Sequence, residues 1–298
     1  MVAPAPAGGR LSPRRLLALI AAAIVVLALA LSVANRRHGE VSVTGAPVLP
    51  QLAAQFGDVT RVTLRRGAAT PGVTLRREAA GWTLEQRAGF AADSTKIRRL
   101  LVALADLRIA EEKTADPANY AALGVDDPGQ AGAAGTEVTL TTATGERRLI
   151  IGKPAAGGNF VRDPSQAQSF LAIPAMTPDG EPRDWIDARL LDIGPERIRE
   201  LLVRPAGGVA VTRPGKDYRA LAGLDVDDVA AAADLDWRSA SVMTITLSDG
   251  ATLVLTGTMA GERHWLQVSS TPDAALAART RGRAFELGAS RYDAIFRP

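Results

Sequence analysis

Apolar residues fill almost every position between Leu16 and Ala34, where Ser32 is the single polar side chain and no charge interrupts the run. A helix over this segment would be about 28 Å long at a rise of ~1.5 Å per residue, close to the hydrocarbon thickness of a bilayer. A buried helix of a soluble core rarely lacks a polar stripe over such a length. The pattern therefore predicts a transmembrane anchor over 16–34, preceded by a cytoplasmic tail over 1–15.

A cleaved signal peptide is the alternative, because Ser32-Val33-Ala34 offers small residues for cleavage. The run is longer than the apolar core of a typical signal peptide, about 7–15 residues, which favours an uncleaved anchor. Arginines flank the run on both sides: Arg10, Arg14 and Arg15 before it, and Arg36 and Arg37 after it. Because the positive charges on the two sides nearly balance, they do not fix the orientation of the helix in the membrane. The short tail before the run and the large part after it favour a cytoplasmic tail and an exported main domain.

Charge and composition refine this location. The chain has 35 basic and 32 acidic residues and a pI of about 9.6, but five of the arginines lie in residues 1–37, where no acid occurs. Beyond residue 37 the balance is slightly acidic, so no basic stripe for nucleic acid is expected. Arginine greatly outnumbers lysine and alanine is abundant, which is typical of a GC-rich bacterial genome. We therefore expect an inner-membrane protein whose main domain is periplasmic.

Past a glycine- and proline-containing stalk over 35–57, the pattern becomes strand-like. Alternating apolar and polar residues over 59–64, 73–77 and 82–85 predict small strands between turns. Asp93 is placed as the N-cap of a helix over 94–107, and a strand hairpin over 138–152 follows. The helix is indicated by apolar residues at helical spacing, namely Ile97, Leu100, Leu101, Leu104 and Leu107.

Much of this order recurs later in the chain. Strand-like segments return over 201–204, 209–212 and 218–221, and Asp225 is placed at the start of a second helix. The segment Gly145–Gly152 matches Gly250–Gly257 with equal glycine spacing. The pattern predicts an α+β fold: an N-terminal transmembrane helix, then a duplicated unit of mainly antiparallel sheet with packed helices. The expected parts are a first unit over 58–174, a connector over 175–193, and a second unit with the C-terminal segment over 194–298.

Several predicted segments also carry a family resemblance. Tyr120 is followed by Leu123-Gly124-Val125-Asp126-Asp127-Pro128, by a hairpin ending Ile150-Ile151-Gly152-Lys153, and by Phe160-Val161-Arg162. Their order resembles the bacterial domain of unknown function 4340, most clearly from Val59 to Ile173. The resemblance implies an envelope protein with a membrane helix, accessory to an ABC transporter of the type linked to gliding motility. It implies no catalytic residue.

Two motifs could suggest ligand sites. Gly152-Lys153-Pro154 follows a predicted strand, but a phosphate loop needs Ser or Thr after the lysine and a helix beyond it, so a turn leaving the sheet is expected. Asp225, Asp227 and Asp228 could hold a divalent cation, yet their spacing is not that of a calcium loop. We expect these acids to cap the second helix, and Asp126-Asp127-Pro128 to form a turn.

The sequence contains few of the residue types that usually carry catalysis. Cysteine is absent, and His38 and His264 are the only histidines. His38 flanks the membrane run, and His264 adjoins a tryptophan in a predicted strand, so a catalytic base is not expected. The four tryptophans are expected in the core rather than on a binding platform: Trp82, Trp185, Trp237 and Trp265. No catalytic, cofactor-binding or metal-binding residue is assigned.

These observations favour a non-enzymatic, single-pass envelope protein that binds or positions a protein partner in an ABC-type transport complex. The alternative is an envelope glycan or lipid hydrolase, or a ligand-binding domain, built from carboxylates and tryptophans. A nucleic-acid partner is not expected, and the sequence leaves self-association open.

Overall fold

The computed structural model describes residues 44–67, 72–215 and 218–297. Residues 45–298 form one compact unit. The predicted tail over 1–15, the predicted anchor over 16–34 and His38 lie outside the described residues. Within the described ranges, no helix is both long and apolar enough to cross a bilayer.

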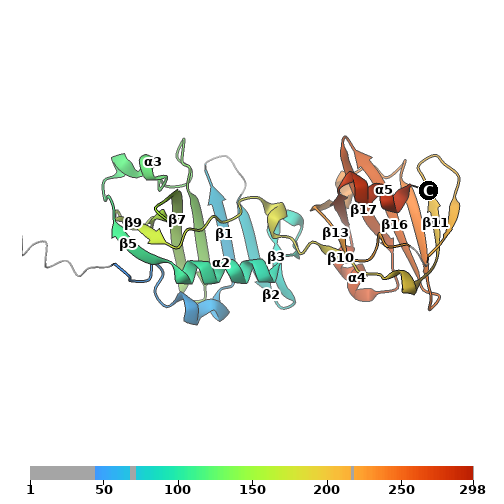
Figure 1. The fold of residues 1–298 in the computed structure, drawn as a ribbon, viewed down its shortest axis with the longest axis horizontal. Helices are drawn as coiled ribbons and strands as arrows, with labels where there is room; N and C mark the ends of the chain where they lie inside the picture. The colour runs from blue at the N-terminus through green and yellow to red at the C-terminus, as the bar shows by residue number, and fades with distance from the viewer. Residues whose placement is uncertain (1–43, 68–71, 216–217, 298) are drawn as a thin grey trace, which may run out of the picture. The chain divides into compact units, whose positions relative to one another are not determined.

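The first half of this unit is a nine-stranded antiparallel sheet with the order β4-β3-β2-β1-β6-β7-β8-β9-β5 (Figure 1). Its strands are β1 (Arg61–Arg66), β2 (Val73–Glu78), β3 (Gly81–Leu84), β4 (Phe90–Ala91), β5 (Arg108–Glu112), β6 (Thr136–Thr142), β7 (Gly145–Ala155), β8 (Gly158–Arg162) and β9 (Ser169–Ile173). Alternate residues of the central strands point into the core, such as Val62 and Leu64 of β1 and Val138 and Leu140 of β6.

The second half is a seven-stranded antiparallel sheet with the order β12-β11-β15-β16-β17-β18-β14. Its strands are β11 (Ile198–Arg204), β12 (Val211–Pro214), β14 (Asp228–Ala231), β15 (Ser241–Leu247), β16 (Thr252–Ala260), β17 (Arg263–Ser270) and β18 (Arg283–Leu287). A separate two-stranded ribbon pairs β10 (Arg189–Leu191) with β13 (Leu224–Asp225). In β15 burial alternates strictly, which places Met243, Ile245 and Leu247 on the core side.

The two sheets share one connection pattern. The order β2-β1-β6-β7-β8-β9-β5 becomes β12-β11-β15-β16-β17-β18-β14 when each strand is replaced by its counterpart in chain order. The first sheet adds β3 and β4 beyond β2. The hairpin segments that match in sequence, Gly145–Gly152 and Gly250–Gly257, lie in the equivalent strands β7 and β16 or the turns that lead into them.

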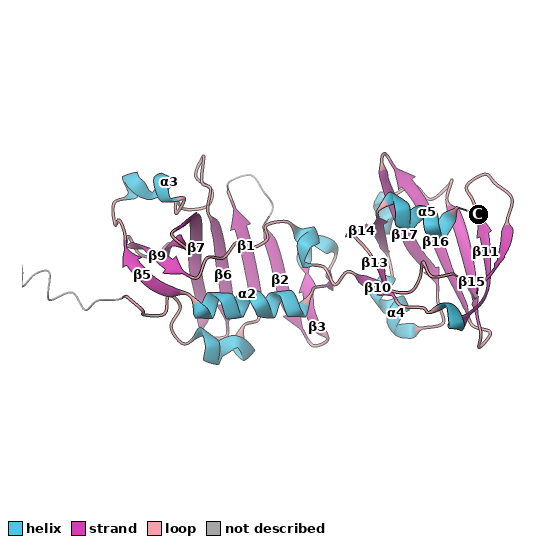
Figure 2. Cartoon of the chain, viewed as in Figure 1, coloured by secondary structure: helices cyan, strands magenta, loops and turns pink. Residues whose placement is uncertain are grey.

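Few helices accompany these strands (Figure 2). The α-helices are α2 (Ser94–Asp106), α3 (Tyr120–Leu123), α4 (Ala274–Thr280) and α5 (Ala289–Phe296). The 3₁₀ segments are η1 (Leu52–Asp58), η2 (Glu85–Arg87), η3 (Pro117–Asn119), η4 (Pro182–Trp185), η5 (Pro195–Arg197) and η6 (Ala232–Asp234). The predicted helix over 94–107 is confirmed by α2, where the Asp93 side chain accepts hydrogen bonds from the backbone N–H groups of Thr95 and Lys96.

The predicted α+β class with packed helices is wrong, because the described residues form mainly antiparallel sheet. The predicted helix from Asp225 is replaced by β13 and β14. Strand β14 pairs with β18 along Asp228–Ala231 and closes the edge of the second sheet. Tertiary pairing thus overrides the helix propensity of this alanine-rich segment.

The chain enters the first sheet along its edge strand. The Gly45 N–H donates to the Ile109 carbonyl at 2.6 Å, the Ile109 N–H donates to the Ala46 carbonyl at 2.9 Å, and the Val48 N–H donates to the Leu107 carbonyl at 3.0 Å. Residues 45–48, which the sequence assigns to the stalk, therefore pair with the start of β5.

Candidate functional site

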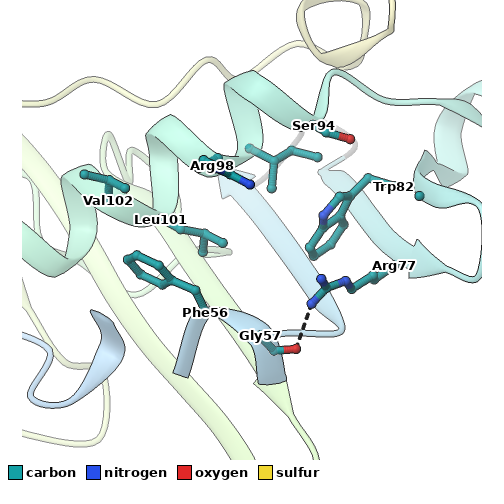
Figure 3. A pocket seen from close by; sticks show the side chains of 10 residues that line it. Phe56, Gly57, Arg77, Trp82, Ser94, Arg98, Leu101 and Val102 are labelled. Carbon is teal, nitrogen blue, oxygen red and sulfur yellow. Dashed lines mark hydrogen bonds between the residues drawn. The ribbon is translucent and has the colours of Figure 1, made fainter. Parts of the chain in front are cut away.

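The candidate site is a hollow beside helix α2, which we call the α2 groove (Figure 3). It lies between α2, the β2–β3 hairpin and η1, and its volume is about 630 Å³. This volume falls in the range of small-ligand and peptide side-chain sites. The groove is lined by Phe56, Gly57, Arg77, Gly81, Trp82, Ser94, Ile97, Arg98, Leu101 and Val102.

The periodicity of α2 places one edge of the helix in the groove. Leu100 and Leu104 are buried in the core of the first sheet. Residues that lie three or four positions apart on a helix share a face, so Arg98 and Val102 lie next to Leu101, which is at the edge of this buried stripe. The same helix therefore packs on the sheet and forms one wall of the groove.

Aromatic and aliphatic side chains form the apolar part of the α2 groove. Phe56, from η1, faces Leu101 of α2, and Trp82 reaches in from β3 (Figure 3). Phe56 and Trp82 are only half-buried. Val102, at the edge of the same hollow, is 41% exposed. Water therefore contacts apolar surface that a ligand could cover.

Two arginines form the polar part of the groove. The Arg77 Nη1 donates to the Gly57 carbonyl oxygen at 2.7 Å, and its guanidinium carbon lies 6.0 Å from the centre of the Trp82 ring. Arg98 is exposed at the rim. Within the described part of the chain, neither arginine has a carboxylate at ion-pair distance. The groove thus combines apolar surface with uncompensated positive charge.

The groove residues suit binding better than catalysis. The lining contains no histidine and no carboxylate, and Ser94 carries its only hydroxyl group. General acid–base chemistry needs a titratable group within hydrogen-bond reach of the reacting atom. Arginine and tryptophan, by contrast, are frequent anchors of protein interfaces.

A second hollow lies in the second half of the molecule, with a volume of about 560 Å³, and we call it the α4 groove. Its walls include Leu190, Ile193 and Leu276, so its floor is also apolar. Most of its charged side chains bind the protein itself, whereas the exposed Arg197 has no hydrogen bond or ion pair from its side chain in the described structure. Asp192, Asp249 and Asp273 accept hydrogen bonds from backbone N–H groups, and Arg279 donates to Asp187.

Lys153 does not form a phosphate loop. The expected turn at Gly152 is wrong, since β7 continues through it to Ala155. The Lys153 ammonium donates to the carbonyls of Ala121 and Ala122, both at 3.0 Å, and so stabilises the C-terminal end of α3. Gly152 is required here because a Cβ atom would lie 2.5 Å from the Leu123 carbonyl oxygen.

The three aspartates near residue 225 neither cap a helix nor gather as ligands. Each binds a different arginine: Asp225 binds Arg189 at 2.6 Å, Asp227 binds Arg291 at 2.9 Å, and Asp228 binds Arg87 at 2.5 Å. The predicted capping role is wrong because strands replace the expected helix. Among the described residues, no group of metal-ligating side chains is assembled.

The family-like motif around Asp127 forms a structural brace. Arg162 is 3% exposed, and its guanidinium donates to the carbonyls of Val125 and Gln166 at 3.0 and 3.1 Å and to Asp127 at 2.5 Å. The guanidinium carbon also lies 4.4 Å from the centre of the Tyr120 ring. Because all three nitrogens of Arg162 have protein acceptors, this cluster fixes the loop before β6 and offers little to a ligand.

His264 and the tryptophans have different surroundings. His264 is half-buried in β17, and its ring lies 4.9 Å from that of Tyr292. Trp185 and Trp265 are 2% and 3% exposed, which confirms the expected core positions. Trp82 and Trp237 are only partly buried against the core, and Trp82 also lines the α2 groove.

Sequence reasoning missed Phe56, Arg77 and Arg98 as site residues. The one available signal was the apolar Val102 beside Arg98, on a helix whose other large apolar residues are buried. The approach of η1 to the β2–β3 hairpin, which completes the groove, has no local pattern.

Comparison with known proteins identifies a family. A family described as "Domain of unknown function (DUF4340)" matches residues 82–249, which is more than half of the chain. No curated protein and no solved structure matches the sequence. The matched region begins at the groove residue Trp82 and includes α2 and the Arg162 brace.

Proposed function

The chain belongs to the DUF4340 family, and from this premise we propose that it is a non-enzymatic binding or scaffold protein of the bacterial envelope. Its partner in this proposal is a membrane transport complex of the ABC type. The observation that carries the binding function is the α2 groove, where half-buried Phe56 and Trp82 stand beside two arginines without an acidic partner in the described structure.

Two properties of the groove support binding of a protein. Its apolar surface is already formed on a helix and a hairpin, so little conformational entropy is lost when a partner binds. Its positive charge can steer an acidic partner and fix its orientation. Neither property requires a reacting group.

The envelope location rests on the sequence. The run over 16–34 has the length and apolarity of an anchor, and the slightly acidic remainder does not favour a nucleic-acid partner. The link to a transport complex rests on the family resemblance and is tested with the partner itself.

The experiment is recovery of the full chain from native membranes. The tagged protein is crosslinked in cells, extracted in mild detergent, and its companions are quantified against an unrelated tagged membrane protein. We expect specific enrichment of transporter subunits. Recovery without any enriched membrane protein would contradict the proposal.

A separate assay addresses the hydrolase alternative. Purified full-length protein is incubated with envelope glycan and lipid fractions, and products are followed by mass spectrometry. Time-dependent product formation that scales with protein concentration would replace the binding proposal with that alternative.

A further inference from the structure

We infer that the α2 groove is the docking site for a segment of a partner protein that carries a carboxylate next to one or two apolar side chains. The inference rests on the proposed function, because it names the chemistry of the partner that this function requires. It is carried by the shape, the exposure and the charge of the groove.

The apolar side chains of the α2 groove determine the first property of the bound segment. Phe56, Trp82 and Leu101 meet in one hollow, and Val102 at its rim is 41% exposed (Figure 3). Covering this surface removes apolar area from water, which is the main driving force of association. A bound segment therefore presents apolar side chains to the hollow.

The arginines set the second requirement. Arg77 is held in place by its hydrogen bond to the Gly57 carbonyl, and that contact engages only one of its nitrogens. The Arg98 side chain makes no hydrogen bond or ion pair within the described ranges, and no acid lines the groove. Guanidinium groups bind carboxylates through paired N–H donors, so the bound segment carries Asp, Glu or a terminal carboxylate.

The charged side chains that line the α4 groove differ from those that line the α2 groove. The α4 groove has a similar volume and an apolar floor, but its three aspartates accept backbone N–H groups and Arg279 binds Asp187. Its lining carries three aspartates beside Arg197 and Arg279, so it has no excess of positive charge. The α2 groove carries two arginines and no acid, so its charge favours an acidic ligand.

A peptide fits this arrangement better than a lipid. The apolar floor at Phe56 and Leu101 is interrupted by the contact between Arg77 and Gly57 on one side and by Arg98 on another (Figure 3). An acyl chain needs continuous apolar contact along its length, whereas a peptide alternates apolar and acidic side chains over short distances.

The test is site-specific photocrosslinking in native membranes with the full-length chain. The photoreactive residue p-benzoyl-phenylalanine replaces Val102 at the groove or, as a control, Val209, which is 86% exposed and does not line either groove. We expect position 102 to crosslink to a protein, and mass spectrometry to place the site in a segment with an acidic residue beside apolar ones. Position 209 should not give this product.

Charge variants of α2 test whether the crosslink depends on Arg98. Arg98→Glu should lower the yield of the position-102 crosslink by about tenfold, which corresponds to ~1.4 kcal/mol of binding free energy. Arg99→Glu is the matched control, because Arg99 is an exposed neighbour on α2 that does not line the groove. Changing the acidic residue of the crosslinked segment to arginine should restore the yield of the Arg98→Glu variant.

Three outcomes would overturn the inference: a crosslink to lipid, a crosslink to a segment without acidic residues, or no product at position 102. An equal loss with Arg99→Glu would also overturn it, since a general effect of charge would then explain the result. If transporter subunits still co-purify in any of these cases, only the docking site is wrong. If they do not, the proposed function fails as well.

Discussion

Seven strands of the first sheet have the same order as the seven strands of the second, yet the two sheets differ in the connections between these strands. In the first sheet, the connection over 79–107 between β2 and β5 contains β3, β4 and the helix α2. In the second sheet, the described residues of the equivalent connection, 215 and 218–227, include the short strand β13 and no helix. The second sheet instead has its helix α4 between β17 and β18. The shared strand order therefore carries different insertions, and the insertion of the first sheet contributes Trp82 and helix α2 to the candidate site.

The insertion also changes what the first sheet needs for stability. Leu104 of α2 is fully buried in the core that the helix shares with the sheet. The second sheet is covered in part by α5, where Tyr292, Ile295 and Phe296 are buried. Each half thus depends on a helix from a different part of the chain, and this dependence can be tested separately in each half.

The largest effect is expected from Leu104→Ala. Removing a fully buried leucine side chain should lower the free energy of unfolding by about 2–5 kcal/mol, because lost burial and a cavity act together. Hydrogen exchange should show reduced amide protection in β1, β2 and β6, with little change in β15 and β16. Val102→Ala is the control and should change stability by no more than ~0.5 kcal/mol. Equal loss of protection in both sheets would show that the halves unfold as one unit.

A smaller effect is expected from Arg162→Met in the brace of the first sheet. The change removes hydrogen bonds from a buried cation to two carbonyls and to Asp127, which should cost about 1.5–3 kcal/mol. Asp127 is itself half-exposed, so its unpaired charge can be hydrated. The measurement is the midpoint of urea unfolding. Arg238→Met, at an ion pair whose arginine side chain is 89% exposed, should leave the midpoint nearly unchanged.

The smallest effect is expected in the second half at alkaline pH. Burial raises the pKa of Tyr218 above its ordinary value of 10.0, and burial also raises the pKa of Tyr292. The unfolded chain then loses these phenol protons first, so stability is complete below pH 10 and falls as pH rises above it. Urea midpoints measured across this range should decline less in Tyr218→Phe than in the natural chain. An unchanged decline would exclude Tyr218 as its source.

The sequence predicted elements whose signals are local. Helix α2 begins at the predicted residue, because an aspartate cap and a helical apolar stripe both lie within its own segment. The predicted strands around Val62, Thr74 and Trp82 are present as β1, β2 and β3 for the same reason. The family resemblance was also correct, since several short motifs follow one another in order.

Features that depend on distant partners could not be predicted. The segment after Asp225 is a strand because β18, far along the chain, pairs with it. The α2 groove forms only where η1 lies against the β2–β3 hairpin, and no hydrophobic periodicity in the sequence predicts that contact. Likewise, Asp228 could not be assigned to Arg87, because 141 positions separate the two residues.

The pairing of residues 45–48 with β5 has a mechanical consequence. A force that pulls on the chain ahead of Gly45 reaches the folded unit through the hydrogen bonds that join Gly45, Ala46 and Val48 to the Leu107–Ile109 segment. Leu107 directly follows α2, so the pulling force acts on the residue next to the helix that forms one wall of the groove. Tension on the chain and binding of a partner in the groove would therefore act on adjoining residues. Single-molecule stretching with and without a bound partner would measure how strongly tension and binding are coupled.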